Sequence, residues 1–315
     1  QSGDGRGASP DTGKTSCLPS GKGVTARQSF FWEGNPSMNL NKTLDRRNFI
    51  LGLGAAAGAV VLAGCSGNSG AGAAASTDSA NAASYALVQD GKIIVASDLA
   101  NPPFDYMDGT TAVGFEVDLM DAVAAKMGLT CEYLPAMKFD SIIPLIKQGG
   151  KADCGVSNFT ITDERKQEID FTDPYIDSNQ GVVVKADSDK TTAEALNADG
   201  VKIACQSGTT GEAWAQENLP KATIVSLDDP VQAVTGVSTG IYDAASADLP
   251  VMKYLCSNSF TDCQVAIEIP TGEQYGIVVS KSNAGLTSAI NETLAALKDD
   301  GTIESLEVKW FGSAM

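Results

Sequence analysis

The sequence has 315 residues, 43% of them hydrophobic, which is enough chain for about two domains with substantial cores. Its 39 acidic and 22 basic residues give a formal net charge of −17, which argues against binding to a nucleic-acid backbone. The sequence contains no histidine, and this excludes a Ser-His-Asp triad, a Cys-His dyad, a zinc site with histidine ligands and a histidine general base.

The segment between Met38 and Cys65 has the organisation of a bacterial secretory signal. Arg46 and Arg47 precede an apolar run, residues 49–64, which ends with Leu-Ala-Gly immediately before Cys65. The arginine pair resembles a twin-arginine export signal, and Leu-Ala-Gly-Cys resembles a lipobox in which Cys65 becomes the lipidated first residue. An uncleaved membrane anchor is the alternative, but an apolar run so rich in Gly and Ala makes a poor permanent span. The lipoprotein interpretation places the folded part outside the cytoplasm, lipid-anchored to the bacterial cell membrane.

Two further stretches flank this signal. Residues 1–37 are rich in Gly and Ser and lack a hydrophobic period, and since Met38 begins a complete signal, we expect them to be a non-native or disordered leader. Residues 65–84 consist mainly of Gly, Ala, Ser and Asn, a composition typical of a flexible tether. The expected order is therefore a leader (1–37), a signal peptide (38–64), a tether (65–84) and a folded part.

From Ala86 onwards, β-branched runs alternate with amphipathic segments, which is typical of α/β units with parallel strands. The first series predicts strands at 92–97, 130–134 and 152–157, and helices at 116–127 and 139–148. In such sheets, ligands bind beyond the carboxyl ends of the strands. The segments that follow the strands, 98–104 and 157–165, are therefore the ones expected to contact a ligand.

A second series of α/β units begins near Val201. It predicts strands at 202–205, 223–225, 243–247 and 265–269, with one helix that opens at 208–211 and others that begin at 230 and 249. A strand at 276–279 and helices at 284–298 and 302–311 follow. Two similar series predict two lobes, and the small second series indicates that the last helices return to the first lobe. We assign 85–182 and 270–315 to lobe 1, and 183–269 to lobe 2.

Short motifs occur in a fixed order along this folded part. They are Asn-Pro-Pro-Phe-Asp at 101–105, Val-Gly-Phe-Glu-Val-Asp-Leu at 113–119, Phe-Asp-Ser-Ile-Ile-Pro at 139–144, Thr-Ile-Thr-Asp-Glu-Arg at 160–165, Ile-Asp-Phe-Thr-Asp-Pro-Tyr at 169–175, Ser-Gly-Thr-Thr at 207–210, Asp-Ala-Ala at 243–245, Tyr-Gly-Ile at 275–277 and Asp-Gly-Thr-Ile at 300–303. With these motifs, the sequence resembles the family 3 extracellular solute-binding proteins, the amino-acid receptors of ABC importers. The resemblance implies a periplasmic-binding-protein-like fold of type II, in which two crossover strands join two α/β lobes around the ligand. It also implies ABC permease subunits as partners and no cofactor.

A receptor for free amino acids needs a cation for the ligand carboxylate, a carboxylate for the ligand ammonium and neutral donors around both. Arg165 lies in the first turn of a predicted helix, where its guanidinium can pair with the ligand carboxylate. On the residues alone, a surface ion pair with Glu164 or Glu168 is an equal alternative; the resemblance implies the ligand contact. Further donors are expected from the hydroxyl of Thr160, the backbone at Asn158 and the helix N-terminus at Thr210.

Two acidic residues follow predicted strands. Asp248 follows the strand at 243–247 and matches the family's ammonium-binding aspartate, and it can also cap the helix that begins at Leu249. Asp98 follows the first strand and corresponds to a family acid that often contacts the ligand side chain or the closing lobe. A capping or loop role is the alternative for Asp98.

An aromatic side chain and an amide are expected beside the ligand side chain. Phe139 matches a family aromatic that packs on the ligand, whereas Asn101 stands where relatives commonly have Tyr or Phe. The aromatic clamp is therefore expected to be one-sided, with Asn101 bonded to a polar ligand group. Together, Asp98 and Asn101 favour a polar or basic ligand such as glutamine, histidine, lysine or arginine.

The seven cysteines suggest one disulfide. Cys256 and Cys263 flank a predicted loop in lobe 2, and export permits disulfides, so a bridge between them is expected. Three others, Cys131, Cys154 and Cys205, fall in predicted strands and are expected to be small buried apolar residues. No close Cys-x-x-Cys pair is present, so no metal site is predicted.

The preferred function is a non-catalytic receptor that closes around a free amino acid and delivers it to an ABC permease. The alternative is an enzyme on the same scaffold, similar to cyclohexadienyl dehydratase, with Asp98 or Asp248 as the general acid. Arg165 and Asp248 at receptor positions, together with the lipobox, favour transport. A sensory domain would need a fused transmembrane or kinase segment.

Overall fold

The computed structural model describes residues 84–314. The expected leader, signal peptide and lipidated Cys65 lie outside the described residues, as does the tether apart from Ser84. None of the helices that are described has the length and apolar character needed to cross a membrane.

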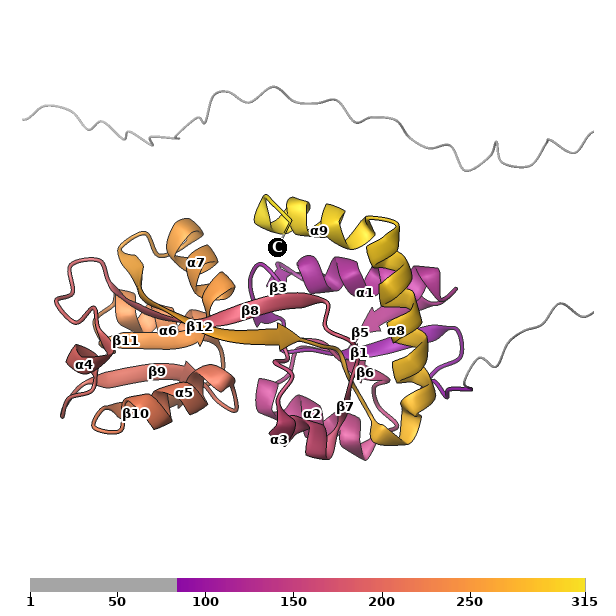
Figure 1. Cartoon of the computed structure of the whole chain (residues 1–315), viewed down its shortest axis with the longest axis horizontal. Helices are drawn as coiled ribbons and strands as arrows, with labels where there is room; N and C mark the ends of the chain where they lie inside the picture. The colour runs from indigo at the N-terminus through magenta and orange to yellow at the C-terminus, as the bar shows by residue number, and fades with distance from the viewer. Residues whose placement is uncertain (1–83, 315) are drawn as a thin grey trace, which may run out of the picture. The chain divides into compact units, whose positions relative to one another are not determined.

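The described residues form two lobes, each built on a five-stranded sheet (Figure 1). In lobe 1, the strand order is β5 (Thr130–Tyr133), β1 (Lys92–Ala96), β6 (Cys154–Gly155), β13 (Val278–Val279) and β7 (Asp170–Phe171). In lobe 2, the order is β10 (Thr223–Leu227), β9 (Lys202–Gln206), β11 (Ala244–Asp248), β8 (Ile176–Lys185) and β12 (Cys263–Tyr275). β1 is parallel to β5 and β6, and β9 is parallel to β10 and β11. The predicted α/β class with two lobes is confirmed.

Two long strands, β8 and β12, connect the lobes. They pair antiparallel from Lys185 with Cys263 at one end to Ile176 with Tyr275 at the other. In Figure 1 they run side by side from the sheet of lobe 2 into lobe 1. The boundaries predicted for the lobes fall within these strands, and β12 extends well beyond the predicted strand at 265–269. The extension brings Glu273 to the region between the lobes.

Helices cover the two sheets. Lobe 1 carries α1 (Phe115–Lys126), α2 (Phe139–Gln148), α3 (Asp163–Glu168), the short 3₁₀ helix η1 (Lys281–Asn283), α8 (Ala284–Asp299) and α9 (Thr302–Phe311). Lobe 2 carries α4 (Ala193–Leu196), α5 (Thr210–Asn218), α6 (Pro230–Ser238) and α7 (Leu249–Asn258). The last two helices, α8 and α9, pack against α1 of lobe 1.

The sequence explains why α2 forms where predicted. Ile142 and Ile146 are one helical turn apart, and both are buried against the sheet of lobe 1. Burying one such side chain contributes about 1.5–3 kcal/mol. The helix ends at Gly149, whose φ of 74° lies in the left-handed region that favours glycine. This packing fixes Phe139, the first residue of α2, at the edge of the cleft.

In lobe 2, side chains at the starts of helices fix the direction of the chain. Thr209 caps α5 by accepting a hydrogen bond from the backbone N–H of Glu212 (3.2 Å). Asp229 caps α6 in the same way, by accepting a hydrogen bond from the backbone N–H of Gln232 (2.7 Å), and Pro230 lies in the first turn. The capped N-terminus of α5 therefore presents Thr210 at the cleft.

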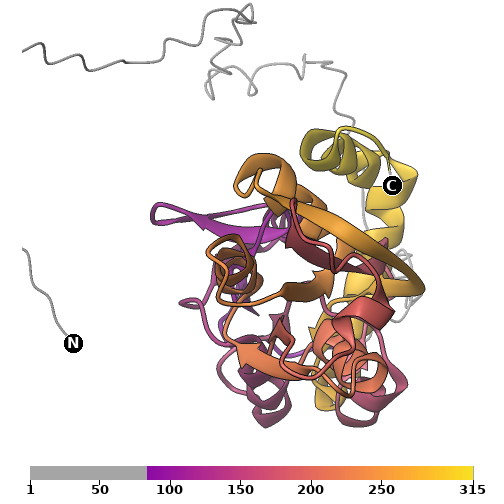
Figure 2. The same cartoon turned by 90° about the vertical axis from the view of Figure 1, so that its left-hand side faces the viewer.

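Two parts of lobe 1 differ from the prediction. Strand β6 contains only Cys154 and Gly155, because the chain turns out of the sheet before Asn158, whose φ is 50°. A small sheet of β2 (Ala100–Asn101), β3 (Asp105–Asp108) and β4 (Thr111–Val113) was not predicted, since its strands are too short to show a period. In Figure 2 the purple β3–β4 hairpin extends outward beside the two lobes.

Candidate functional site

The candidate site is the cleft where the carboxyl ends of β1 and β6 face those of β9 and β11. One cavity there is lined by ten residues, namely Asn101, Phe139, Ser157, Asn158, Thr160, Arg165, Gln206, Thr209, Thr210 and Asp248. Seven of the eight residues predicted to bind the ligand are among them, and Asp98 lies directly behind Asn101 and Gln206. The cavity has a volume of only about 10 Å³, which is about the space of one water molecule.

Arg165 is the cation of this cleft. Its guanidinium donates to the carbonyl oxygen of Thr160 in lobe 1 (2.8 Å) and to that of Gly208 in lobe 2 (2.9 Å). Neither expected surface partner binds it, and Glu168 instead pairs with Lys147 (3.0 Å). Among the described residues, Arg165 has no carboxylate within ion-pair distance, so part of its forked donor set is available to a ligand carboxylate.

Aromatic rings hold this guanidinium in place. Its central carbon lies 5.4 Å from the ring centre of Phe139 and 5.7 Å from that of Phe159. The two rings are stacked, with centroids 4.6 Å apart and planes at 22°. Burial lowers the pKa of Arg165, and the negative charges of Asp248 and Glu273 oppose that shift. Phe139 therefore forms one wall of the cleft, and Phe159 supports it from behind.

The donors predicted beside Arg165 are partly where expected. Thr160 and Thr210 come from opposite lobes, and their hydroxyl oxygens are 3.4 Å apart. The backbone N–H of Asn158, predicted as a ligand donor, instead donates to the carboxylate of Glu116 (3.0 Å). The backbone of Asn158 has a left-handed φ of 50°, so the chain changes direction at the residue whose N–H contacts Glu116. Asn158 is nevertheless one of the residues that line the cavity.

Asp248 lies in lobe 2, and its negative charge acts on the Arg165 guanidinium. It is the last residue of β11, and its Oδ1 accepts a hydrogen bond from Gln180 Nε2 (2.6 Å). Burial, followed by the charge of Glu273, raises the pKa of Asp248 to about 6. Asp248 occupies the N-cap position of α7, but its side chain makes no capping hydrogen bond. Its carboxylate therefore serves the cleft and not the helix.

At the other end of the cleft, Asp98 is the centre of a polar network. Its carboxylate accepts hydrogen bonds from Asn101 Nδ2 (2.8 Å), Ser157 Oγ (2.6 Å) and Gln206 Nε2 (2.6 Å). Burial raises the pKa of Asp98, and the bonds from Ser157 and Gln206 oppose this increase. Because Gln206 belongs to lobe 2, the network also joins the two lobes.

Asp105 and Glu116 support this network from the core of lobe 1. Ser157 Oγ lies 2.7 Å from Asp105 Oδ2 as well as 2.6 Å from Asp98. A hydroxyl has one proton, so it can donate to only one of the two carboxyl groups. Burial and the charges of Asp98 and Glu116 raise the pKa of Asp105 well above its usual value, which favours Asp105 as the protonated member. Burial similarly raises the pKa of Glu116 to about 8.

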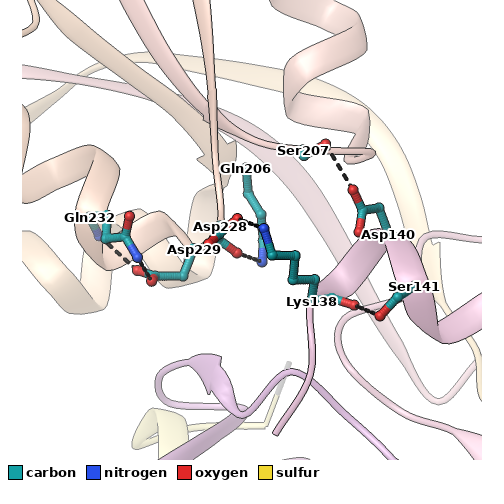
Figure 3. A network of polar contacts seen from close by, with 8 residues as sticks. All are labelled: Lys138, Asp140, Ser141, Gln206, Ser207, Asp228, Asp229 and Gln232. Carbon is teal, nitrogen blue, oxygen red and sulfur yellow. Dashed lines mark hydrogen bonds and ion pairs between the residues drawn. The ribbon is translucent and has the colours of Figure 1, made fainter.

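Polar contacts at the rim also join the lobes (Figure 3). Lys138, just before α2, pairs with Asp228 of lobe 2 (2.7 Å), and Ser207 of lobe 2 donates to Asp140 (3.1 Å). The Lys138 and Asp228 side chains are exposed, so their ion pair contributes little. With Arg165 bonded to both lobes as well, the structure has the lobes closed on each other.

Sequence reasoning did not name five polar residues of the cleft: Ser157 and Thr209, which line the cavity, and Gln180, Gln206 and Glu273. Gln206 is the last residue of β9, and the rule that ligands meet strand ends would have found it. Gln180 and Glu273 lie on the two connecting strands, which the periodicity of the sequence did not reveal. Glu273 Oε2 accepts hydrogen bonds from both Thr160 and Thr210 (3.2 and 3.3 Å).

The predicted disulfide is not present in the structure. Cys256, in the last turn of α7, and Cys263, at the start of β12, are both free thiols. Cys263 Sγ instead contacts the carboxylate of Asp262 (3.9 Å), and both cysteines pack with the apolar core. Cys154 and Cys205 are buried, as expected, whereas Cys131 is only half-buried at the edge of its sheet.

Three comparisons place this geometry among known proteins. The model of the bacterial extracellular solute-binding proteins, family 3, matches residues 93–313. The ABC transporter arginine-binding protein 1 of Escherichia coli K12 is 33% identical over 217 residues, which are 67% of this chain and 86% of that protein. The structure of an ancestral arginine-binding protein bound to glutamine aligns with a TM-score of 0.67 at 35% identity, covering 71% of this chain and 100% of that chain. An ancestral amino-acid-binding protein described as a precursor of cyclohexadienyl dehydratase aligns with a TM-score of 0.64 at 36% identity, covering 70% and 95%.

Proposed function

Because the chain belongs to the bacterial extracellular solute-binding proteins of family 3, we propose that it binds a free amino acid between its lobes and delivers it to an ABC permease. One observation carries the proposal: Arg165 has no carboxylate partner among the described residues, and it stands in a polar cleft with Asp248. These are the two charges that a zwitterionic ligand needs.

The cleft provides a subsite for each charge of the amino acid. The ligand carboxylate pairs with Arg165 and accepts hydrogen bonds from Thr160 and Thr210. The ligand ammonium donates to Asp248, which is most effective as an acceptor when it is ionised. Arg165 and Thr160 belong to lobe 1 and Thr210 and Asp248 to lobe 2, so the ligand makes all its contacts only when the lobes are closed. Ligand binding therefore favours the closed form.

The other end of the cleft suits a polar or basic ligand side chain. Asp98 is an acceptor, while Asn101 and Gln206 each carry an amide that can donate or accept. Phe139 provides an apolar wall for the methylene groups of a long side chain. Among the relatives, proteins named as arginine-binding are consistent with this chemistry, and a cationic side chain beside Asp98 would gain a charged hydrogen bond.

Of the two candidates for the general acid of a dehydratase, Asp248 is the charge assigned here to the ligand ammonium, and Asp98 is already engaged. Asp98 already accepts hydrogen bonds from Asn101, Ser157 and Gln206, so its carboxylate is held as an acceptor. The precursor of cyclohexadienyl dehydratase among the similar structures is itself described as an amino-acid-binding protein. These observations favour a receptor over an enzyme on this scaffold.

We also propose that the protein works on the outer side of a bacterial membrane. The twin-arginine pair and the lipobox support export and a lipid anchor at Cys65. The Gly-, Ala- and Ser-rich tether would let the receptor reach its permease. Mass spectrometry of the mature protein tests this: a lipid-modified Cys65 at its N-terminus is expected, and an unmodified N-terminus upstream of Arg46 would contradict it.

A thermal-shift assay tests the function itself. The protein is unfolded and refolded to remove bound ligand, and it is then heated with each of the twenty amino acids and with prephenate and arogenate. A ligand at 100 times its Kd should stabilise the fold by about 2.7 kcal/mol. A shift with one or a few amino acids is expected, whereas turnover of a cyclohexadienyl acid without such a shift would support the enzyme instead.

A further inference from the structure

Glu116 is a fully buried acidic residue of lobe 1 that does not line the cleft. It is the second residue of α1, and its backbone N–H donates to the carbonyl oxygen of Phe104 (2.8 Å). The N–H of Phe115 donates in the same way to Pro103 (3.0 Å). Gly114 permits this close approach, because its φ is 137° and a Cβ atom there would lie 2.0 Å from the Phe104 carbonyl oxygen. The start of α1 therefore places the Glu116 side chain in the core of lobe 1.

The Glu116 carboxyl group binds the backbone of the loop that follows β6. Both of its oxygens lie within hydrogen-bond distance of the Asn158 N–H (3.0 and 3.2 Å), and Tyr175 donates its hydroxyl proton to Oε1. None of the ion pairs among the described residues involves Glu116. Burial raises the pKa of Glu116 to about 8, and the hydrogen bonds from Tyr175 and Asn158 oppose this increase. A buried carboxyl group without a cation is costly unless hydrogen bonds satisfy it, so these two contacts are what stabilise it there.

The loop that is held in this way carries contacts at both ends of the cleft. Ser157 donates to Asp98 (2.6 Å), and the carbonyl oxygen of Thr160 accepts a hydrogen bond from Arg165 (2.8 Å). Between them, Asn158 has a φ of 50°, a left-handed conformation that persists in a residue other than glycine only where its surroundings hold it. All of these residues belong to lobe 1, so the arrangement does not depend on where lobe 2 lies.

We propose that Glu116 is a positioning residue for ligand binding, which holds the left-handed turn at Asn158 and thereby sets the positions of Ser157 and Thr160 in the cleft. This inference rests on the proposed function, because it takes the residues of this loop as ligand subsites. Glu116 does not contact the ligand and acts through the backbone of Asn158. Without its acceptor oxygens, the Asn158 N–H is left buried without a partner, and the turn loses a constraint. Part of the binding free energy then goes into ordering the turn, so the ligand binds more weakly.

Glu116→Met tests the proposal, because methionine is an unbranched, adaptable side chain that fills the space without an acceptor oxygen. Isothermal titration with the amino acid that gives the largest thermal shift should show that Kd increases about ten-fold or more. Glu116→Gln keeps one acceptor oxygen, so its Kd should increase by only about three-fold. The glutamine variant also serves if the methionine variant does not fold. An unchanged Kd in a folded variant would overturn the proposal.

Asp153→Asn is the matched control for the glutamine variant. Asp153 is also a buried acid of lobe 1 whose carboxylate accepts backbone hydrogen bonds, from Val88 and Ile94 (both 2.7 Å), but it does not line the cleft. The control should lower the thermal stability and leave Kd unchanged. If it weakens binding as much as Glu116→Gln does, the effect belongs to the core of lobe 1 in general, and the positioning role of Glu116 is wrong.

Hydrogen exchange of the Asn158 backbone amide, measured by NMR, tests Glu116 without a ligand. This amide should exchange slowly in the unchanged protein and about ten-fold or more faster in Glu116→Met, while the Ile94 amide keeps its rate. An unchanged rate at Asn158 would overturn the role of Glu116. If no amino acid binds, the proposed function fails, and the exchange rate still decides whether Glu116 holds the turn.

Discussion

The two ends of the cleft differ in how completely their charged groups are satisfied. At one end, Arg165 binds only carbonyl oxygens of the described residues, and no carboxylate neutralises it. At the other end, the Asp98 carboxylate already accepts three side-chain hydrogen bonds. The Arg165 end therefore offers an unpaired guanidinium to the carboxylate of any α-amino acid, although its threonine hydroxyl groups bond Glu273, whereas the Asp98 carboxylate binds a ligand side chain only by replacing its existing partners. One end of the cleft therefore recognises α-amino acids in general, and the other end selects among them by their side chains.

The largest effect is expected at the Arg165 end. Arg165→Ala removes the partner of the ligand carboxylate, and affinity should fall by about 2–5 kcal/mol for every amino acid that binds. Isothermal titration measures the loss. Lys166→Ala is a suitable control and should bind the ligand normally. Lys166 is next to Arg165 but exposed, and its one ion pair, with Asp163, is long (3.9 Å). Near-native affinity of Arg165→Ala would show that the carboxylate is bound elsewhere.

A smaller and selective effect is expected at the Asp98 end. Asp98→Asn preserves the shape but removes the charge, so cationic amino acids should lose about 1–3 kcal/mol of affinity and neutral ones much less. Titration with a cationic amino acid and with glutamine separates the two cases. The same loss for both ligands would mean that Asp98 only holds the loop and Gln206, without contacting the ligand side chain.

The pH dependence should reveal Asp248. Its pKa of about 6 in the folded protein exceeds the ordinary value of 3.8, so ionisation of Asp248 opposes folding. The stability of the empty protein should therefore decrease as the pH rises from about 4 to about 6. Ligand affinity should change in the opposite direction, falling as the pH is lowered through 6, because the ammonium needs the ionised carboxylate.

Calorimetry in buffers of different ionisation enthalpy checks this linkage. At pH 6, binding should release protons, and Asp248→Asn should abolish the release together with most of the affinity. Proton uptake on binding, or a release that persists in Asp248→Asn, would assign the linkage to another carboxyl group of the cleft.

The smallest effect is expected at the rim. Lys138→Ala breaks an ion pair with Asp228 whose side chains are both more than half exposed, so affinity should change by less than about five-fold. The effect should disappear at high salt. A large loss that persists in salt would show that the rim, and not the ligand subsites, controls closure.

The sequence alone was sufficient for the lobes and for most of the cleft. Helix α2 was predicted residue for residue because Ile142 and Ile146 mark its buried face. Arg165 and Asp248 were predicted because each follows the end of a strand and carries a charge that an amino acid requires. For Arg165 this local pattern left a surface ion pair as an equal alternative, and the family resemblance implied the ligand contact.

The remainder of the cleft depends on contacts between distant segments. Glu273 meets Thr160 and Thr210 only because β12 crosses between the lobes, and no local pattern encodes that crossing. The backbone of Asn158 binds Glu116, a residue 42 positions away, and not the ligand. The expected Cys256–Cys263 bridge shows the same limit, since a short spacing does not determine whether two thiols bond.

Titration of the refolded protein with three ligands tests whether Arg165 and Asp248 bind the two charges of an amino acid. The ligands are the best amino acid and two analogues of it, one lacking the α-carboxylate and one acetylated on the α-amine. If Arg165 and Asp248 bind the two charges of the ligand, the amino acid binds and each analogue loses about 2–5 kcal/mol of affinity. If either analogue binds as tightly as the amino acid itself, the corresponding subsite is wrong and the account of the cleft is contradicted.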